Sequence, residues 1–566
     1  MFKKFIIIAI LLIHFPLKAE GVSLSNTKDS NKEFESDIKN IIGEKGNINI
    51  PSLSGADFGA LENNETPLYL ESIDYKYSIK APKNIFDFVN NKTKQIVDQK
   101  IKIKDLVGFL KQLEKDFVTI GYPMVRVVFP AQSFEAKKAK PLVYIISGII
   151  ENIVIENDKK EDENIEQIIL NILEPLKNKE YIDVKTINEK MLILKGLYGL
   201  SSKIFLSRGG RQGGFVVNVK VLYKYEQSLA SIKNNLNSMY GSYSIQMMQI
   251  NNFVKNDVGQ SIKIIPSLSL KQTPNVYYRS LVFLYNRYFI TGSFIEMSLL
   301  QSSSSSIVNN NYNTYSQNSN IGAIYTQPLI LNYSEQSYVS AGVQYINSTM
   351  KNENTNTYQY KDTVVETTVV GEHTIKTTQG VHKTKISLNK SINTLGAKYN
   401  TINGISSSRS GVTGSASRII GSYKFLKDLL SREQFKFVFN FQYTFNNPVL
   451  SSQQYSATGF EKVQGLIGDG FTGDEGYSVY AEYNFKPKVI KGNIFTPFLS
   501  ASFSKLYRKK PTSVESKNVS ARSISGGVSV LLGSNMLLKA SLNYAEKHGM
   551  KSVYNKSIGL SLINQF

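Results

Sequence analysis

The sequence predicts two small α+β units followed by an all-β transmembrane barrel of about 16 antiparallel strands. The first of three observations behind this prediction is the last stretch of the chain, residues 557–566. Ile558, Leu560, Leu562 and Phe566 alternate with small or polar residues, so the stretch is a strand with one apolar and one polar face. About ten residues are enough for one tilted crossing of a bilayer. A closed barrel would pair this strand with the first one, whereas a soluble sheet would leave an aggregation-prone edge.

The second observation is an aromatic strand at residues 435–445. Its odd positions are all Phe or Tyr, and Lys, Val, Thr and amide side chains lie between them. This pattern suits a barrel with lipid outside and water inside, although a soluble sandwich with the aromatic face inward would show the same alternation. Further segments of the same kind favour the barrel: Val339–Ile346, Tyr477–Phe485 and Met536–Tyr544.

The third observation is a repeated order of elements at 68–149 and 150–225. Each unit reads strand, helix, helix, strand, strand, with a period of about 75 residues. In the first unit the pattern places strands at 68–77, 125–129 and 142–146 and helices at 84–97 and 106–120, with Gly121 ending the second helix. In the second unit it places strands at 153–156, 203–207 and 215–222 and helices at 163–174 and 184–197.

The N-terminus has the form of an export signal. Lys3 and Lys4 precede an apolar core at 5–13, and Ala19 is a plausible cleavage point, so residues 1–19 are predicted to be a signal peptide. Residues 20–66 are polar and read as a linker, with one amphipathic helix expected at 32–43.

From residue 226 to 566 no segment has a convincing helical pattern. Polar stretches at 301–320 and 350–384 are too long for short turns, and we expect them to be loops on the outer side of the membrane. The net charge of +21 is concentrated in this part of the chain without forming a basic cluster, which disfavours nucleic acid as a partner. Basic residues at the rim or inside a barrel would instead meet lipid phosphates or a polar passenger; the alternative, to which we give equal weight, is a general bias of the composition toward Lys and Asn.

Composition excludes several kinds of site. The chain has no Cys, and its four His residues are scattered, so neither a disulfide nor a metal site is expected. We find no nucleophile–base constellation and expect no enzymatic activity and no cofactor. Asp474, Glu475 and Glu482 have two readings, an acid pair or cation site and a lumenal polar network, of which we favour the network. The glycine-rich run 209–214 lacks the Gly-Lys-Ser/Thr and the following helix of a phosphate loop, so a hairpin loop is expected.

Two such units ahead of a barrel of this size resemble the outer-membrane transporters of two-partner secretion, which belong to the superfamily of outer-membrane insertases. The resemblance covers about 68–566, and the two units would be POTRA domains. Its most specific local match is a Gly-Tyr-x-x-x-Arg-x-x-x-Pro-x-Gln pattern with a later closing Gly, formed by Gly121, Tyr122, Arg126, Pro130, Gln132 and Gly148. Gly121 as a helix stop and Pro130 as a strand end give the same pattern a purely structural meaning.

The barrel motifs of the family match less well. Val463, Gln464, Gly465 and Leu466 take the place of its Val-Arg-Gly-Phe/Tyr loop tip, and Gly473-Asp474-Glu475-Gly476 and Glu482 follow as in its Gly-Asp-x-Gly stretch. The family Arg pairs with an Asp on a later strand, where this chain has Ser502. Because losing both charges together leaves neither unpaired, we expect Gln464 and Ser502 to face each other through a neutral hydrogen bond.

The resemblance implies an outer-membrane transporter of a Gram-negative bacterium, with its POTRA domains in the periplasm. Its partners would be a large secreted exoprotein of the adhesin or haemolysin type, outer-membrane lipid and lipopolysaccharide, and the barrel-assembly machinery that inserts it. Arg126, Pro130, Gln132, Arg208 and Arg211 are the candidate exoprotein contacts, and Phe566 matches the family's assembly signal. A barrel-assembly factor or a passive porin remains as an alternative, and the helix at 32–43 is a candidate plug of the lumen.

Overall fold

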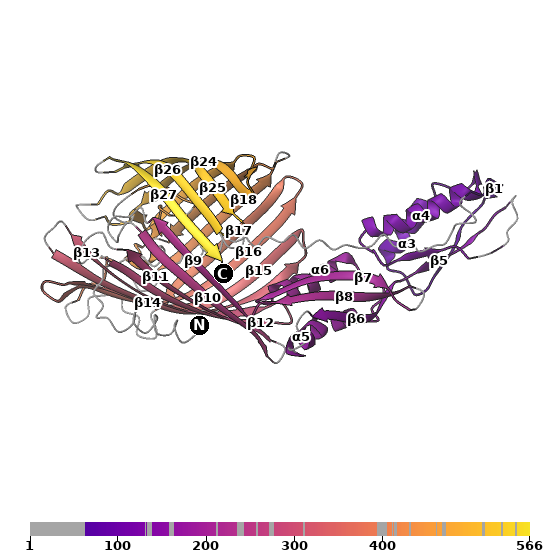
Figure 1. Cartoon of the computed structure of the whole chain (residues 1–566), viewed down its shortest axis with the longest axis horizontal. Helices are drawn as coiled ribbons and strands as arrows, with labels where there is room; N and C mark the ends of the chain where they lie inside the picture. Colours follow the sequence, from indigo (N-terminus) through magenta and orange to yellow (C-terminus); the bar gives the residue numbers. More distant parts are fainter. Residues whose placement is uncertain are drawn as a thin grey trace.

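The computed structural model places two α+β units in an arm beside a barrel (Figure 1). It describes residues 63–130, 132, 138–157, 163–210, 213–234, 243–255, 258–270, 277–308, 312–392, 405–409, 411–412, 416–429, 432–445, 447–459, 461–466, 471–511, 515–533, 536–549 and 552–565. The predicted signal peptide, the helix expected at 32–43, Arg211 and Phe566 lie outside these residues.

The first unit contains the predicted helices and a three-stranded sheet. Its elements are β1 (Pro67–Leu70), β2 (Asp74–Tyr77), α3 (Lys83–Thr93), β3 (Gln99–Lys102), α4 (Ile103–Thr119), β4 (Arg126–Val128) and β5 (Leu142–Ile146). The sheet has the order β2-β5-β4, with β2 parallel and β4 antiparallel to β5. The single strand predicted at 68–77 is in fact two strands, because Leu68 and Leu70 enter the core while β1 pairs with β3 instead of joining the main sheet.

The second unit repeats the arrangement. It comprises β6 (Ile149–Asn157), α5 (Glu163–Leu173), the short 3₁₀ turn η1 (Glu174–Leu176), α6 (Val184–Gly196), β7 (Leu200–Arg208) and β8 (Gly214–Tyr223). Its sheet order is β6-β8-β7, again with one parallel and one antiparallel pair around the central strand. The side chain of Asp183 caps α6 by accepting a hydrogen bond from the Thr186 N–H at 2.7 Å.

The two units are joined by main-chain and side-chain contacts. The Val184 N–H donates to the Gly121 carbonyl at 2.8 Å, and the Tyr181 hydroxyl donates to the Ile79 carbonyl at 3.3 Å. A Cβ on Gly148 would lie 2.3 Å from the Met124 carbonyl oxygen, so only glycine allows this close approach. The glycines of the predicted motif therefore shape the arm.

The second unit also packs against the barrel rim that faces the arm, which we call the near rim. Leu197 lies against Gly259, and Tyr288 of the barrel occupies the space beside Gly196, where a Cβ would lie 2.0 Å from its hydroxyl oxygen. Val254 and Tyr288 belong to the same buried apolar cluster as the core of the second unit. This shared core fixes the arm to the near rim.

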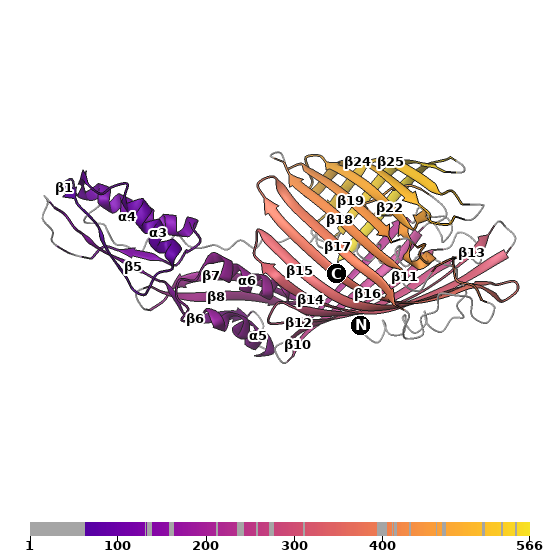
Figure 2. The same cartoon turned by 180° about the vertical axis from the view of Figure 1, so that it is seen from behind.

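The barrel is closed and has 16 principal strands, as predicted (Figure 2). They are β9 (Glu226–Asn234), β10 (Tyr243–Lys255), β11 (Val258–Leu270), β12 (Tyr277–Phe289), β13 (Phe294–Val308), β14 (Tyr312–Leu331), β15 (Glu335–Asn352), β16 (Thr357–Thr377), β17 (Gly380–Ile392), β18 (Ser417–Asp428), β19 (Gln434–Thr444), β22 (Glu475–Asn484), β24 (Asn493–Tyr507), β25 (Asn518–Leu532), β26 (Met536–His548) and β27 (Val553–Gln565). The short β23 (Lys488–Ile490) pairs with β24 in the connection from β22. Closure comes from the last strand pairing antiparallel with the first, with Ser561 opposite Lys233 and Gln565 opposite Leu229.

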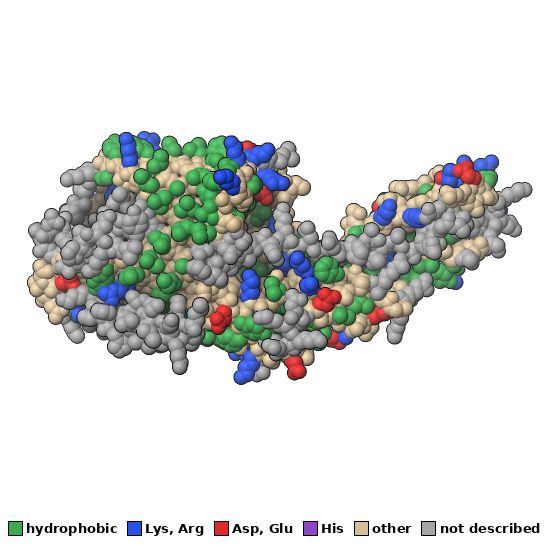
Figure 3. All heavy atoms as spheres, in the orientation of Figure 1, with side chains coloured by type: hydrophobic (Ala, Val, Ile, Leu, Met, Phe, Trp, Pro, Cys, Tyr) green, Lys and Arg blue, Asp and Glu red, His purple; other side chains and the backbone are tan. Residues whose placement is uncertain are grey.

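Apolar side chains cover the outside of the barrel, and the inside is lined by polar side chains together with a buried apolar cluster that includes Leu229, Ile265 and Ile563. Figure 3 shows hydrophobic side chains gathered over the barrel wall around β25, β26 and β27. In β27 the outward residues Ile558 and Leu560 are 58% and 42% exposed, as the alternation predicts. In β19 Lys436 and Gln442 are buried and bond to residues inside the barrel, which puts the aromatic face of 435–445 outside. Among the described residues, no helix is long and apolar enough to cross a bilayer.

The loops expected at 301–320 and 350–384 were a wrong prediction. Residues 301–308 continue β13, residues 312–320 begin β14, and β16, at 357–377, fills most of 350–384. These strands have Ser, Asn and Thr on both faces, so they lack the alternation of an apolar exterior. They are held by antiparallel pairing, such as Ser302 opposite Asn318 and Ser319 opposite Asn347, which depends on the backbone and not on side-chain polarity.

Candidate functional site

The connection from β19 to β22 folds back along the inside of the barrel. It begins with the 3₁₀ turn η3 (Ser451–Gln453), and β20 (Tyr455–Ser456) then pairs with β21 (Thr472–Gly473). Beyond β20 the segment crosses the inner wall. Its contacts run from Ser478 on β22, through Ser504 on β24 and Ser523 on β25, to Asn555 on β27. We call residues 445–474 the lumenal loop.

An apolar cluster attaches the lumenal loop to the wall. Leu506 of β24 and Val519 and Ala521 of β25 point inward and are at most 4% exposed. They pack against four buried loop residues and one partly buried one, which are Tyr455, Ala457, Val463, Phe471 and Leu466. This inner patch breaks the rule that the lumenal face is polar, and the loop covers it.

A carboxylate on the loop is held by two lysines of the wall. Glu461 accepts from the Lys424 ammonium of β18 at 2.8 Å and makes an ion pair with Lys436 of β19. The side chains of Glu461 and Lys436 are 15% and 9% exposed, so the interaction is largely shielded from water. In the family pattern the loop supplies the cation and the wall the anion. In this chain the loop supplies the anion and the wall the cations. Glu461, Lys424 and Lys436 lie outside the motif positions, so the motif did not predict this ion pair.

Asp474 connects three loops at the end of the barrel away from the arm, the far rim. One carboxylate oxygen accepts from the Arg409 guanidinium and from the Val449 N–H, both at 2.8 Å, and the other accepts from the Lys509 N–H at 2.7 Å. The Asp474 side chain is fully buried. Asp474, which was predicted as a lumenal partner, therefore connects the segments that contain Arg409, Val449 and Lys509.

A second buried network surrounds η3. Arg418 of β18 makes a bidentate ion pair with Glu366 of β16 at 2.6 and 2.7 Å, and donates to the Gln453 carbonyl at 2.6 Å. The Gln453 amide donates to Glu366 and to Ser391, both at 2.8 Å. A paired charge whose remaining lone pairs are hydrogen-bonded is tolerated inside a protein. The sequence analysis missed this pair, because 52 residues separate its two members.

Gln464 and Ser502 are not joined by the side-chain hydrogen bond that we expected. They are connected through Ser523. The main-chain N–H of Gln464 donates to the Ser523 hydroxyl at 3.1 Å, and the Ser523 and Ser502 hydroxyls are 2.7 Å apart. The link is neutral, as expected, but it runs through a third residue and uses the backbone of the loop. Gly465 has a φ of +83°, and a Cβ there would lie 2.8 Å from Asn543, so glycine is required at this turn.

Glu482 points into the lumen, as the alternation predicts. It accepts from the Tyr480 hydroxyl at 2.5 Å and lies 3.4 Å from the Lys539 ammonium. Glu475 pairs with Lys509 at 2.7 Å, and Asp474 is engaged as described above. Among the described residues no cluster of three or more His, Asp or Glu side chains is placed to hold a metal ion. Asp474 and Glu475 both contact Lys509, through its main-chain N–H and its ammonium, and Glu482 contacts Tyr480 and Lys539, so all three carboxylates belong to polar networks.

In the arm, the predicted contact residues hold the fold. Arg126 pairs with Glu114 at 2.6 Å and stacks over Phe215 of the second unit. The Gln132 side chain accepts from the Leu142 N–H and donates to the Leu142 carbonyl, both at 2.7 Å, and also donates to the Pro130 carbonyl at 3.3 Å. The hydrogen bonds of Gln132 thus hold the chain against β5 beyond the point where the main-chain pairing of β4 with β5 ends.

The glycine-rich run has an internal anion. The Gly210 N–H donates to the Glu151 carboxylate at 2.8 Å, and a Cβ on Gly209 or Gly214 would collide with that carboxylate. The loop therefore holds a side chain of its own unit where a phosphate loop would hold phosphate. Arg208 ends β7 opposite Phe215, and its side chain, like all of Arg211, is not described.

Comparisons with known proteins identify the fold. No family model and no curated protein matches the chain. Among solved structures, CdiB from Escherichia coli matches with a TM-score of 0.72 at 13% identity, over 96% of this chain and 98% of that one. CdiB from Acinetobacter baumannii matches with a TM-score of 0.62 at 13% identity, over 95% and 98%. The fold of POTRA domains followed by a 16-stranded barrel, which the resemblance to two-partner secretion transporters implies, is confirmed.

Reversing the charge of Glu461 should detach the lumenal loop. Glu461→Lys adds a third cation beside Lys424 and Lys436, and losing one partner of a buried ion pair costs about 3–5 kcal/mol, so the detached population should rise by roughly a hundredfold or more. We expect larger and more frequent conductance steps in planar bilayers. Adding Lys436→Glu should restore the pair and the low conductance, and Glu226→Lys, at an exposed position where β9 begins, is the control. Unchanged conductance of Glu461→Lys would contradict this role of the ion pair.

Proposed function

We propose that this chain moves an unfolded exoprotein across the outer membrane, with the arm in the periplasm and the far rim at the cell surface. One observation carries the proposal: an arm with unpaired strand edges is fixed to the near rim of a closed barrel whose lumen contains a loop held by separable polar contacts. The CdiB structures share the overall fold, but at 13% identity they do not determine what passes through this barrel.

The rigid joint supports delivery from the arm to the barrel. Tyr288 and Leu197 fix the second unit at the near rim, and the Tyr181 contact with Ile79 fixes the first unit to the second. A segment bound to a strand edge of the arm is therefore held at a set position relative to the barrel entrance. Strand addition suits such capture, because main-chain hydrogen bonds accept many sequences.

Transport would require the lumenal loop to move aside. The contacts at Glu461 and at Gln464 are polar, and an ion pair exposed to entering water loses most of its strength. The buried hub at Asp474 and the Arg418–Glu366 pair lie at the base of the loop and would hold it while the tip moves. Folding of the exoprotein at the cell surface would make its passage hard to reverse.

The two alternative functions, barrel assembly and passive diffusion, differ from exoprotein transport in which molecules depend on this chain. An assembly factor would act on many barrel proteins, and a passive porin would have no use for an arm. The polarity of the ion pairs at Glu461 does not distinguish these functions, because an anion on the loop and cations on the wall attach the loop as well as the opposite arrangement would.

A secretome comparison tests the proposal. The source bacterium lacking this chain should lose one large exported protein from its surface and medium, and the full chain supplied on a plasmid should restore it. Mass spectrometry of surface and medium fractions is the measurement. Loss of several outer-membrane barrels would instead indicate an assembly factor, and a fall in small-solute uptake with an unchanged secretome would indicate a porin.

We also propose that residues 20–66 restrict the lumen, through the helix expected at 32–43. Deleting 20–66 while keeping the signal peptide should raise the conductance of the purified protein in planar bilayers. The deletion combined with Glu461→Lys should exceed either change alone if the segment and the loop act separately. Conductance that does not change on deletion would rule out a plug in this segment.

A further inference from the structure

The lumenal loop extends toward the near rim as far as Glu461. The loop leaves β19 and joins β22 at the far rim, because consecutive strands alternate in direction. Its partners Lys424 and Lys436 lie toward the opposite end of the barrel, since β18 ends at Asp428 and β19 begins at Gln434 on the near rim. A segment that enters from the arm therefore passes these two lysines before it reaches the base of the loop.

Glu461 lies at the tip of a tight turn. A bridge between Thr458 and Val463 closes the turn, and the Lys462 N–H donates to the Gly459 carbonyl at 3.3 Å. Glu461 has a φ of +55°, in the left-handed region that is unfavourable for a residue with a side chain. Its ion pairs with the wall offset this backbone cost. A competing carboxylate that carries no such cost can therefore replace Glu461.

The wall beside Glu461 has an excess of positive charge. Lys383, whose own carboxylate partner is on β16, lies directly opposite Lys424, and like charges in such a cross-strand pair repel each other. Lys436 lies opposite Glu482, but that carboxylate is shared with a lysine of β26. When the loop moves aside, Lys424 and Lys436 lose the Glu461 oxygen that both of them contact, and this part of the wall becomes more positive.

We propose that Lys424 and Lys436 form a carboxylate-binding site, which Glu461 occupies at rest and an acidic segment of the exoprotein occupies during transport. This site rests on the proposed function. The entering carboxylate takes the place of Glu461 between the two ammonium groups, so the loop detaches without leaving their charges uncompensated. Release of the loop is thereby coupled to the arrival of the exoprotein, and the segment that enters first is rich in Asp or Glu.

The exchange begins at the more accessible of the two lysines. The Lys424 side chain is 24% exposed, whereas that of Lys436 is 9% exposed and its ammonium lies 6.0 Å from the centre of the Tyr480 ring. A carboxylate that enters through the lumen reaches Lys424 while Glu461 still contacts Lys436. The two ammonium groups therefore never lack a carboxylate at the same time.

Peptide binding to a variant without the competing carboxylate tests the site. The probe is a fluorescein-labelled ten-residue peptide of alternating Glu and Ser, and its counterpart carries Lys in place of Glu. Because Glu461→Gln frees the site, the detergent-solubilised variant should bind the acidic peptide about tenfold more tightly than the unchanged chain does. It should also prefer the acidic peptide to the basic one. Fluorescence anisotropy is the measurement, and equal affinity of the variant and the unchanged chain for the acidic peptide would overturn the proposal.

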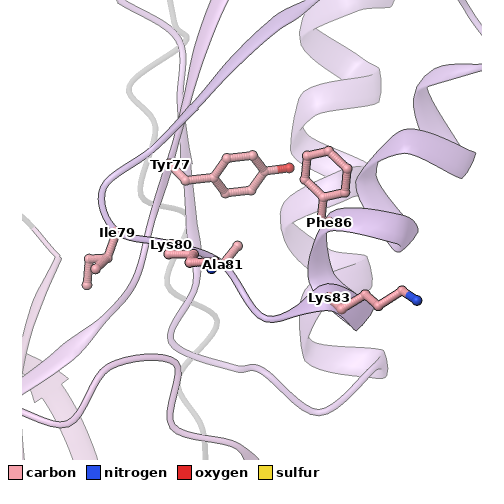
Figure 4. Close-up of a pocket in the computed structure, with 6 residues that line it drawn as sticks. All are labelled: Tyr77, Ile79, Lys80, Ala81, Lys83 and Phe86. Atoms are coloured by element: carbon pink, nitrogen blue, oxygen red, sulfur yellow. The ribbon is translucent and has the colours of Figure 1, made fainter.

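Charge reversal assigns the binding to the wall. In the Glu461→Gln background, Lys424→Glu with Lys436→Glu should invert the preference, so that the basic peptide binds better, a result that misfolding cannot produce. The control in the same background is Lys80→Glu with Lys83→Glu, two exposed lysines beside a pocket in the first unit of the arm (Figure 4). It should keep the acidic preference. A wall variant that still prefers the acidic peptide would overturn the proposal, as would loss of this preference in the control alone, which would place binding in the arm.

Conductance tests whether binding releases the loop. With the unchanged chain in a planar bilayer, the acidic peptide added on the side of the arm should raise the frequency of large conductance steps severalfold, and the basic peptide should not. In Glu461→Gln these steps should be frequent before any peptide is added. A step frequency that the acidic peptide leaves unchanged in the unchanged chain would contradict the coupling.

The peptide assays and the secretome comparison fail independently. The assays use purified protein, so a negative result in them leaves the loss of an exported protein in the secretome standing. A secretome with no missing protein would refute transport of an exoprotein, whereas the inverted peptide preference would still establish the carboxylate site on the wall.

Discussion

The structure depends on one constraint, which is that main-chain N–H and C=O groups surrounded by lipid must find partners within the chain. A sheet meets this constraint only by closing, and it closes here where Leu562 of β27 pairs with Ile232 of β9. Closure separates an apolar outside from a polar inside and forces a period of two on the lipid-facing strands. It also creates a lumen, and in this chain the lumenal loop lies across part of its inner wall. The arrangement of charges inside follows from that loop.

At the attachment of the lumenal loop, the charges of the described residues lie in ion pairs whose members come from different segments. Glu461 on the loop meets Lys424 and Lys436 on the wall, and Glu366 meets Arg418. Removing one member would leave an uncompensated buried charge, which is strongly destabilising. The loop thus has an ionic attachment at Glu461, while the link from Gln464 through Ser523 to Ser502 is neutral. Such contacts hold a loop in place and yet separate when water or a polypeptide enters.

How much could be predicted from the sequence depended on how local each pattern was. The alternation of β19 and β27, the periodicity of α4 and the repeated order of the two arm units all lie within one segment and were predicted correctly. β13, β14 and β16 were missed where their polar residues lie on both faces, so only register holds them. Glu461 and the two wall lysines lie 37 and 25 residues apart, and nothing in one segment indicates the other. Arg126 and Gln132 matched a motif, but only the structure shows them bonded to Glu114 and Leu142. The inward Leu506 and Val519 could not be assigned without the loop that covers them.

The alternation of lipid-facing and lumen-facing residues in the barrel wall offers the most direct test of this account. The sequence has no Cys, so single Cys residues can be introduced and labelled one at a time. Single Cys residues placed in turn from 556 to 563 of β27 would be labelled in reconstituted membranes, once with a water-soluble maleimide and once with a reagent confined to the lipid. The account predicts alternation, with the Ile558 and Leu560 positions reacting from the lipid and the Ser561 position from water, while the Ser557 position, whose hydroxyl is buried beneath Gly465 of the lumenal loop, stays unlabelled. Labelling from water at both sets of positions, or with the two sets exchanged, would contradict the barrel and the transport function built on it.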